Sequence, residues 1–184
     1  TLIDEDTYVD TMSFAVEMLV ERKVKDNWGI DAEIKSPRLR YELKIERKKN
    51  SRGFDELSIS HEYLNKISTD EDIWSKTFIP RQRQNLWKST QKGGSSNPFI
   101  NTETLNGLPS IYIRQDGGQG GKATPARTVS QTVLSGVNSV DFPHVFAAKE
   151  EMRNWRFMQL NPEDLRQPTK QDAKMSYEIT HSGA

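Results

Sequence analysis

The sequence contains no cysteine and no long apolar run, and both absences limit what the protein can be. Without cysteine, disulfide bonds and thiolate metal sites are excluded. No apolar run reaches about 18 residues, the length that indicates a membrane-spanning helix, so we predict a cytoplasmic protein without membrane contact. The opening stretch TLIDEDTYVD is acidic, unlike a signal peptide. It also lacks an initiator methionine, so either the start is processed or the chain begins inside a longer protein.

The sequence is poor in apolar residues and has no excess charge. Apolar residues make up 34% and charged residues 28%, whereas about 45–50% apolar, glycine included, is usual for a globular domain. We therefore expect long solvated loops, or a segment that rests against a larger body. Lysine plus arginine and aspartate plus glutamate both number 26, so any attraction of nucleic acid must come from local basic patches.

Motifs for metal binding and catalysis are also missing. The three histidines, His61, His144 and His181, are far apart in the sequence and do not have the spacing of a zinc site. Ser135, in LSGV, does not lie in a nucleophile elbow. We predict no catalytic residue and no metal site in this chain.

A glycine-rich stretch, IYIRQDGGQGGKATPAR at 111–127, invites comparison with a phosphate-binding P-loop. If Gly121 and Lys122 are aligned with the end of that motif, the first glycine is replaced by Asp116 and the magnesium-binding hydroxyl by Ala123. A carboxylate repels phosphate, and alanine cannot bind a metal ion. We therefore interpret residues 110–127 as a short strand and a flexible glycine loop, and predict that this segment alone binds neither ATP nor Mg²⁺.

Alternation of apolar and polar residues predicts an antiparallel sheet. The clearest strand is RLRYELKIERK, from residue 38, and FDELSISHEYL is its return strand, so a β-hairpin is expected over 38–66. In the return strand, the alternation places Leu57, Ile59, His61 and Tyr63 on one face. A further strand is predicted around 14–20.

The rest of the chain suggests few helices. Residues 67–107 read as a loop-rich insertion, with a short helix near 70–75 capped by Ser68 or Thr69. A longer helix is expected over 141–155, with one apolar stripe that ends in a buried Trp155. We predict the α+β class for residues 1–184 as a single segment: a mainly antiparallel sheet with a few helices and long loops. The residues of the stripe are Phe142, Val145, Ala148, Met152 and Trp155.

Basic residues cluster in two places, on the hairpin and beside Trp87. Cations next to an aromatic ring can bind a phosphate backbone and stack a base. The alternative is a set of solvated charges balanced by neighbouring glutamates. The hairpin cluster comprises Arg38, Arg40, Lys44, Arg47, Lys48, Lys49 and Arg52. The residues predicted to contact nucleic acid are Arg81, Arg83, Lys88, Lys92, Lys48 and Lys49.

Three short motifs resemble one known family. Glu62-Tyr63-Leu64 resembles a Glu-x-Leu element that ends a strand pair, and Thr132–Ser135 resembles a T-x-L-S helix. The stretch WRFMQLNPEDLR, from Trp155 to Arg166, resembles W-R-x-x-x-L-x-P-x-x-L-R. Together they resemble the portion that follows the Walker A helix in RecF/SMC-like AAA-family ATPases with an ABC-type head.

The resemblance implies that this chain is an internal piece of the first lobe of such a head. Walker A would precede residue 1, and the signature and Walker B motifs would follow residue 184. The parent would bind ATP and Mg²⁺ between two heads, as a homodimer, and act on DNA in repair or in defence against foreign DNA. Gln159 would correspond to the magnesium-sensing glutamine. The alternative is a non-catalytic binding or adaptor module for nucleic acid or protein.

Overall fold

The computed structural model describes residues 10–49, 52–90, 97–105, 108–118, 121–126 and 131–156. The chain divides after Arg153 into two units, and the fold below is that of the first. It belongs to the α+β class with a mainly antiparallel sheet, as the alternating sequence pattern predicts. No helix among the described residues is long and apolar enough to cross a membrane.

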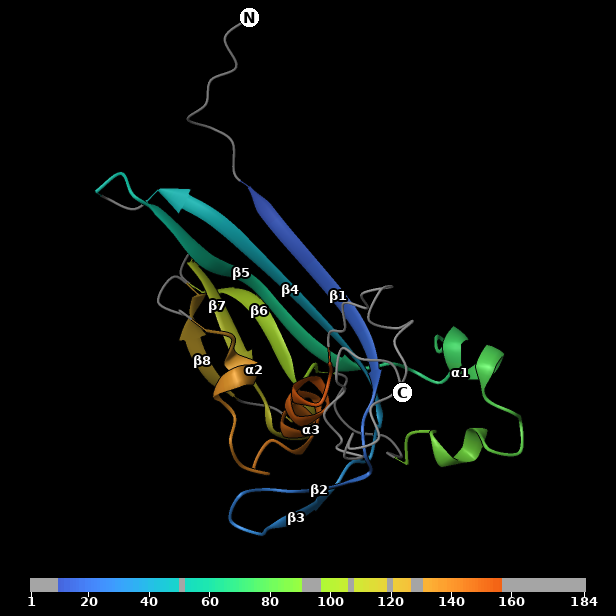
Figure 1. The fold of residues 1–184 in the computed structure, drawn as a ribbon. Coiled ribbons are helices and arrows are strands. Elements are labelled where there is room, and N and C mark those ends of the chain that lie inside the picture. The colour runs from blue at the N-terminus through green and yellow to red at the C-terminus, as the bar shows by residue number, and fades with distance from the viewer. Residues whose placement is uncertain are drawn as a thin grey trace, which may run out of the picture. The chain divides into compact units, whose positions relative to one another are not determined.

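A six-stranded antiparallel sheet forms the body of the fold (Figure 1). Its strands lie in the order β1-β4-β5-β6-β7-β8, so the edges are β1 and β8. Two short strands, β2 and β3, form a separate ribbon at the β1–β4 connection. The strands are β1 Thr11–Leu19, β2 Lys23–Lys25, β3 Asp31–Glu33, β4 Arg38–Lys49, β5 Asp55–Lys66, β6 Ile100–Leu105, β7 Leu108–Ile113 and β8 Lys122–Pro125.

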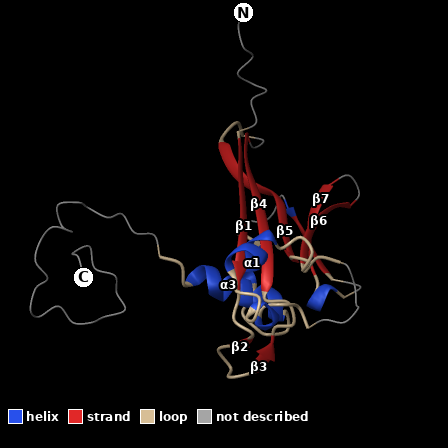
Figure 2. Cartoon of the chain, turned by 90° about the vertical axis from the view of Figure 1, so that its right-hand side faces the viewer, coloured by secondary structure: helices blue, strands red, loops and turns tan. Residues whose placement is uncertain are grey.

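The helices are few and short, and they cover only part of the sheet. The longest, α3, packs its buried residues, among them Val145 and Ala148, into the core that Leu39, Leu64 and Ile111 form on the sheet. The far half of the β4–β5 hairpin extends past these helices (Figure 2). The helical elements are α1 Ile73–Phe78, α2 Val133–Gly136 and α3 Pro143–Arg153, with 3₁₀ turns η2 Gln84–Leu86 and η3 Gln115–Gly117.

A β-bulge changes the face on which the residues of β5 lie. Lys44 pairs with His61 but the next residue of β4, Ile45, pairs with Ile59, so Ser60 is the extra residue. Such an extra residue reverses the alternation beyond it. Ile59 and Glu62 are buried, whereas His61 is only partly buried. The prediction that Leu57, Ile59, His61 and Tyr63 share one face is therefore wrong.

The bulge brings the carboxylate of Glu62 into the core, where it holds α2. Its two oxygens accept hydrogen bonds from the backbone N–H groups of Val133 and Leu134, at 2.7 and 2.9 Å. The hydroxyl of Tyr41 donates to the same carboxylate at 3.2 Å. Burial raises the pKa of Glu62, although these N–H donors favour the ionised form and limit the rise.

Three helix and strand predictions need correction. The helix expected over 141–155 ends at Arg153, and Trp155 is 47% exposed, so this ring is not part of the buried stripe. The short helix begins at Ile73, because Asp72 accepts the N–H of Ser75 as its cap, in place of Ser68 or Thr69. Ile100–Leu105, in the stretch expected to be loop, forms β6.

Two leucines of β5 test where the core ends. Leu64 is fully buried, whereas Leu57, on the extended half of the hairpin, is 69% exposed. Leu64→Ala should lower the free energy of unfolding by about 2–5 kcal/mol because it leaves a cavity. Leu57→Ala should change it by no more than about 0.5 kcal/mol. Urea denaturation of both variants measures this difference, and equal losses would contradict the described packing.

Candidate nucleic-acid interface

The segment after β5 is held to the sheet by a buried ion pair between Arg38 and Asp72. The guanidinium donates from Nε and Nη2 to the two Asp72 oxygens, at 2.9 and 3.0 Å. It also donates to the Met18 carbonyl at 3.1 Å and to Glu17 at 3.1 Å, and lies 4.8 Å from the ring centre of Trp74. Arg38 is thus buried and neutralised, which corrects its assignment to the solvated basic cluster.

A second group of contacts holds the end of the same segment. Arg22 donates to the carbonyl oxygens of Leu86 and Lys88, at 2.8 and 2.6 Å. The hydroxyls of Ser36 and Ser89 lie 2.7 Å apart. The segment between Asp72 and Ser89 is therefore fixed at both ends, although neither α1 nor η2 contains a buried residue.

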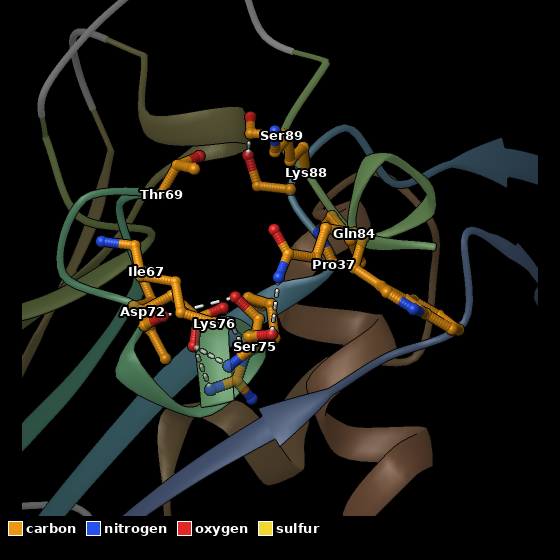
Figure 3. Close-up of a pocket in the computed structure, with 12 residues that line it drawn as sticks. Pro37, Ile67, Thr69, Asp72, Ser75, Lys76, Gln84, Lys88 and Ser89 are labelled. Atoms are coloured by element: carbon orange, nitrogen blue, oxygen red, sulfur yellow. Dashed lines mark hydrogen bonds and ion pairs between the residues drawn. The ribbon is translucent and has the colours of Figure 1, made fainter. Parts of the chain in front are cut away.

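Between these two attachments lies a pocket of about 130 Å³ (Figure 3). Most of its lining side chains are polar, and Lys88 contributes an ammonium group. The ammonium of Lys76 donates to the Asp70 carbonyl at 2.8 Å, and the amide of Gln84 donates to the Ile79 carbonyl at 3.1 Å. Hydroxyl, amide and ammonium groups are the donors that bind phosphate oxygens in nucleic-acid complexes. Trp87 adds an aromatic surface of the kind on which a base stacks. The lining residues are Ser36, Pro37, Arg38, Ile67, Thr69, Asp72, Ser75, Lys76, Gln84, Trp87, Lys88 and Ser89.

The two basic clusters differ in how far their charges are neutralised. The side chains of Arg81, Arg83 and Lys88 are exposed and form no ion pair with any described residue. On the hairpin, Lys48 lies 2.5 Å from Glu46, and Arg47 is paired with two aspartates. The described ion pairs therefore neutralise Arg47 and Lys48 on the hairpin but not Arg81, Arg83 or Lys88.

The same two clusters are separated by the length of a strand. Lys48 and Lys49 lie at the far end of β4, whereas Arg38, at its near end, contacts the segment that carries Arg81 (Figure 1). Twelve residues of strand span roughly 35–40 Å. The structure does not combine these cations into one patch. Lys92 lies outside the described residues.

The glycine loop connects two strands. Lys122 is exposed and begins β8, whereas a P-loop lysine precedes the first turn of a helix. Asp116 adopts a left-handed backbone conformation, with φ of 47°. Its carboxylate lies 2.8 Å from Nδ1 of His144, and this hydrogen bond holds the pKa of Asp116 below its usual value.

His144 and Asp116 have the arrangement of a catalytic pair but not its accessibility. The ring of His144 is buried and stacks on Phe99, with centres 4.3 Å apart. Its Nε2 accepts the backbone N–H of Ser36 at 3.2 Å. Both ring nitrogens are therefore engaged, and no lone pair remains to act as a general base. Through these contacts, His144 joins α3 to Asp116 in the β7–β8 connection and to Ser36, the residue before Pro37.

Comparisons with protein-family models, with curated proteins and with solved structures find no match for this chain. Within the described ranges, no group of three or more histidine, aspartate or glutamate residues could hold a metal ion. Gln159, the proposed magnesium-sensing residue, lies outside them.

Sequence patterns did not reveal the buried polar residues of this fold. Arg38 has the same alternation as the solvated Arg40, and Asp72 stands in an acidic run typical of a helix start. The one local feature that sets Arg38 apart from Arg40 is its position, since it follows Pro37 and is the first residue of β4. Asp72, the cap of α1, pairs with Arg38, which lies 34 residues away in the sequence. Local sequence patterns do not reveal such a long-range contact.

Replacing Asp72 tests whether the pair fixes the segment. Asp72→Asn should lower the free energy of unfolding by about 3–5 kcal/mol, because Arg38 then remains buried with an incomplete set of acceptors. Asp70→Asn, at an exposed position close in the sequence, should cost no more than about 0.5 kcal/mol. Chemical denaturation of the two variants provides the comparison.

The same pair predicts a pH dependence. Burial alone would raise the pKa of Asp72, but the hydrogen bonds from Arg38 and Ser75 outweigh it and hold the pKa below its usual value. A lowered native pKa contributes stability that is complete above the unfolded pKa of about 3.9 and is lost as the pH falls through the native value. The stability gap between the wild type and Asp72→Asn should therefore narrow below about pH 3.9. A constant gap down to pH 2 would contradict this role.

Proposed function

We propose that this chain forms the antiparallel part of an ABC-type head in a RecF/SMC-like ATPase that acts on DNA in the cytoplasm. ATP and Mg²⁺ would be held by motifs outside residues 1–184, between two heads of a homodimer. Hydrolysis would then open the pair of heads, a switch between two arrangements of rigid parts. The chain itself would supply a DNA-contacting surface and no catalytic residue.

One contact supports this proposal more than any other. Two of the motifs that carry the family resemblance are 71 residues apart in the sequence, yet Glu62 of the first binds the backbone of the second at Val133 and Leu134. Residues that meet in a buried hydrogen-bonded network act as one structural unit. The two motifs are thus neighbours in the fold as well as parts of one resemblance, and this contact is the observation on which we base the proposal.

A second candidate function is a free-standing adaptor without catalysis. Arg81, Arg83 and Lys88, which form no ion pair with any described residue, favour it, because this surface needs no neighbouring domain to attract phosphate. The coding sequence next to this chain distinguishes the two functions. An in-frame Walker A motif upstream supports the ATPase, whereas a start codon and promoter directly upstream support the adaptor.

Both functions predict that the segment from Arg81 to Lys88 binds DNA. The triple variant Arg81→Ala, Arg83→Ala, Lys88→Ala should weaken binding to any DNA sequence. The slope of log affinity against log salt should fall by about one for each lost phosphate contact. Fluorescence anisotropy with labelled single-stranded and duplex oligonucleotides, at several salt concentrations, measures both quantities.

The hairpin provides the matched control for this experiment. Lys48→Ala with Lys49→Ala also removes cations, but Lys48 is already neutralised by Glu46. We expect this double variant to change the affinity and the salt slope much less than the triple variant. If the triple variant binds with unchanged affinity and slope, the cations at Arg81–Lys88 are ordinary solvated charges.

The ATPase proposal also predicts that this chain alone does not bind nucleotide. Asp116 turns its carboxylate to His144, and Lys122 stands on an exposed strand. Titration calorimetry with ATP and Mg²⁺ should detect no binding, and Lys122→Ala should leave the result unchanged. Micromolar binding that disappears in Lys122→Ala would instead identify the glycine loop as a nucleotide site.

A further inference from the structure

Within the described part of the chain, the outer side of the edge strand β1 pairs with no other strand. The strand has nine residues and pairs, among the described strands, only with β4. Its register with β4 is continuous from Thr11 to Leu19, without a bulge. An edge of this length exposes a row of backbone donors and acceptors that another strand can use.

Two hydrogen bonds define which backbone groups of β1 point outward. At one end, Arg47 donates its N–H to the Asp10 carbonyl at 3.0 Å, and at the other Val20 donates to the Pro37 carbonyl at 2.9 Å. In an antiparallel pair, hydrogen-bonded positions alternate with positions whose N–H and C=O face away. The even-numbered residues of β1 therefore bond to β4. The outward groups belong to Thr11, Ser13, Ala15, Glu17 and Leu19.

The residues of β1 themselves provide little of the protection that proteins give to an edge strand. It contains no proline and no lysine, and its one charged residue, Glu17, is bound by Arg38 and Arg40. The opposite edge, β8, has only four residues and ends in Pro125. The two edges of the sheet therefore differ in their capacity to accept another strand.

We propose that two copies of this chain associate by antiparallel pairing of their β1 strands, with Ala15 on the two-fold axis. In this register, Ser13 pairs with the second copy's Glu17 and Thr11 with its Leu19, so every outward N–H meets a carbonyl. The two Glu17 side chains do not face each other. A two-fold contact requires such a self-complementary surface, and the sequence TMSFAVEML provides it about its central residue.

The same register matches the apolar side chains. Met12 pairs with the second copy's Met18, and Phe14 with its Val16, in the positions without hydrogen bonds where side chains approach most closely. Met12 and Phe14 are 58% and 51% exposed in the single chain. Pairing would remove part of this apolar surface from water and join the two sheets. The contact requires neither ATP nor DNA, and so goes beyond the head-to-head contact of the proposed ATPase.

The test introduces a charge on the two-fold axis. Sedimentation equilibrium of the wild type, without nucleotide, should show a dimer. Ala15 is exposed, so the fold should accommodate Ala15→Lys. The variant places like charges opposite each other and should give a monomer. Ala15→Glu should also give a monomer, and an equimolar mixture of the two variants should recover the dimer. Thr104→Lys, an exposed position on the interior strand β6, makes the same charge change and should leave the dimer intact.

Several results would overturn the proposal. A wild type that stays monomeric at the highest attainable concentration would show that β1 is free or is covered by another segment of this chain. A dimer that persists in Ala15→Lys would place the contact elsewhere. Circular dichroism of each variant identifies any loss of fold. If Ala15→Lys does not fold, Ala15→Pro, which removes an outward N–H and leaves the bonds to β4, serves as the second variant.

Discussion

The buried carboxylate of Glu62 is the interaction on which the attachment of α2 to the sheet depends. A charged group in a core must be compensated by hydrogen bonds, since removing it from water is expensive. Glu62 meets this requirement with two N–H groups of α2 and the hydroxyl of Tyr41. A helix of four residues has little stability of its own. Its position therefore depends on the sheet, and the cluster joins β4, β5 and α2.

Polar side chains also attach the segment between β5 and β6 to the rest of the fold. Arg38 and Arg22 use planar guanidinium groups to hold two points of a chain that has almost no core of its own. Between those points the charges of Arg81, Arg83 and Lys88 remain available. The segment thus combines attachment to the sheet with exposed cations that form no ion pair with any described residue.

Local patterns predicted the parts of the fold that local forces determine. The hairpin, the strand around 14–20 and the helix from Pro143 follow from side-chain period and from proline at a first turn. The position of the bulge could not be inferred, because Ser60 is an ordinary strand residue and the shift depends on pairing with β4. For the same reason, the sequence did not predict that the side chain of Glu62 faces the core. Trp155 was assigned to a helix stripe that ends before it, because helix length is set by tertiary contacts. For the site, nucleic-acid contact by the Arg81–Lys88 cations stays a prediction, and the sequence did not predict the pocket that Lys88 lines.

The double attachment of the segment from Asp72 to Ser89 also affects how such a protein can evolve. Lengthening a chain between two fixed points costs little, about 0.6 kcal/mol for each doubling of a flexible loop. Insertions between Pro80 and Gln84 would leave the carbonyl groups that Arg22 binds, at Leu86 and Lys88, and the Arg38–Asp72 pair in place. Ligand preference could thus diverge between descendants of this chain through changes in loop length and composition, while the scaffold stayed under separate selection for stability.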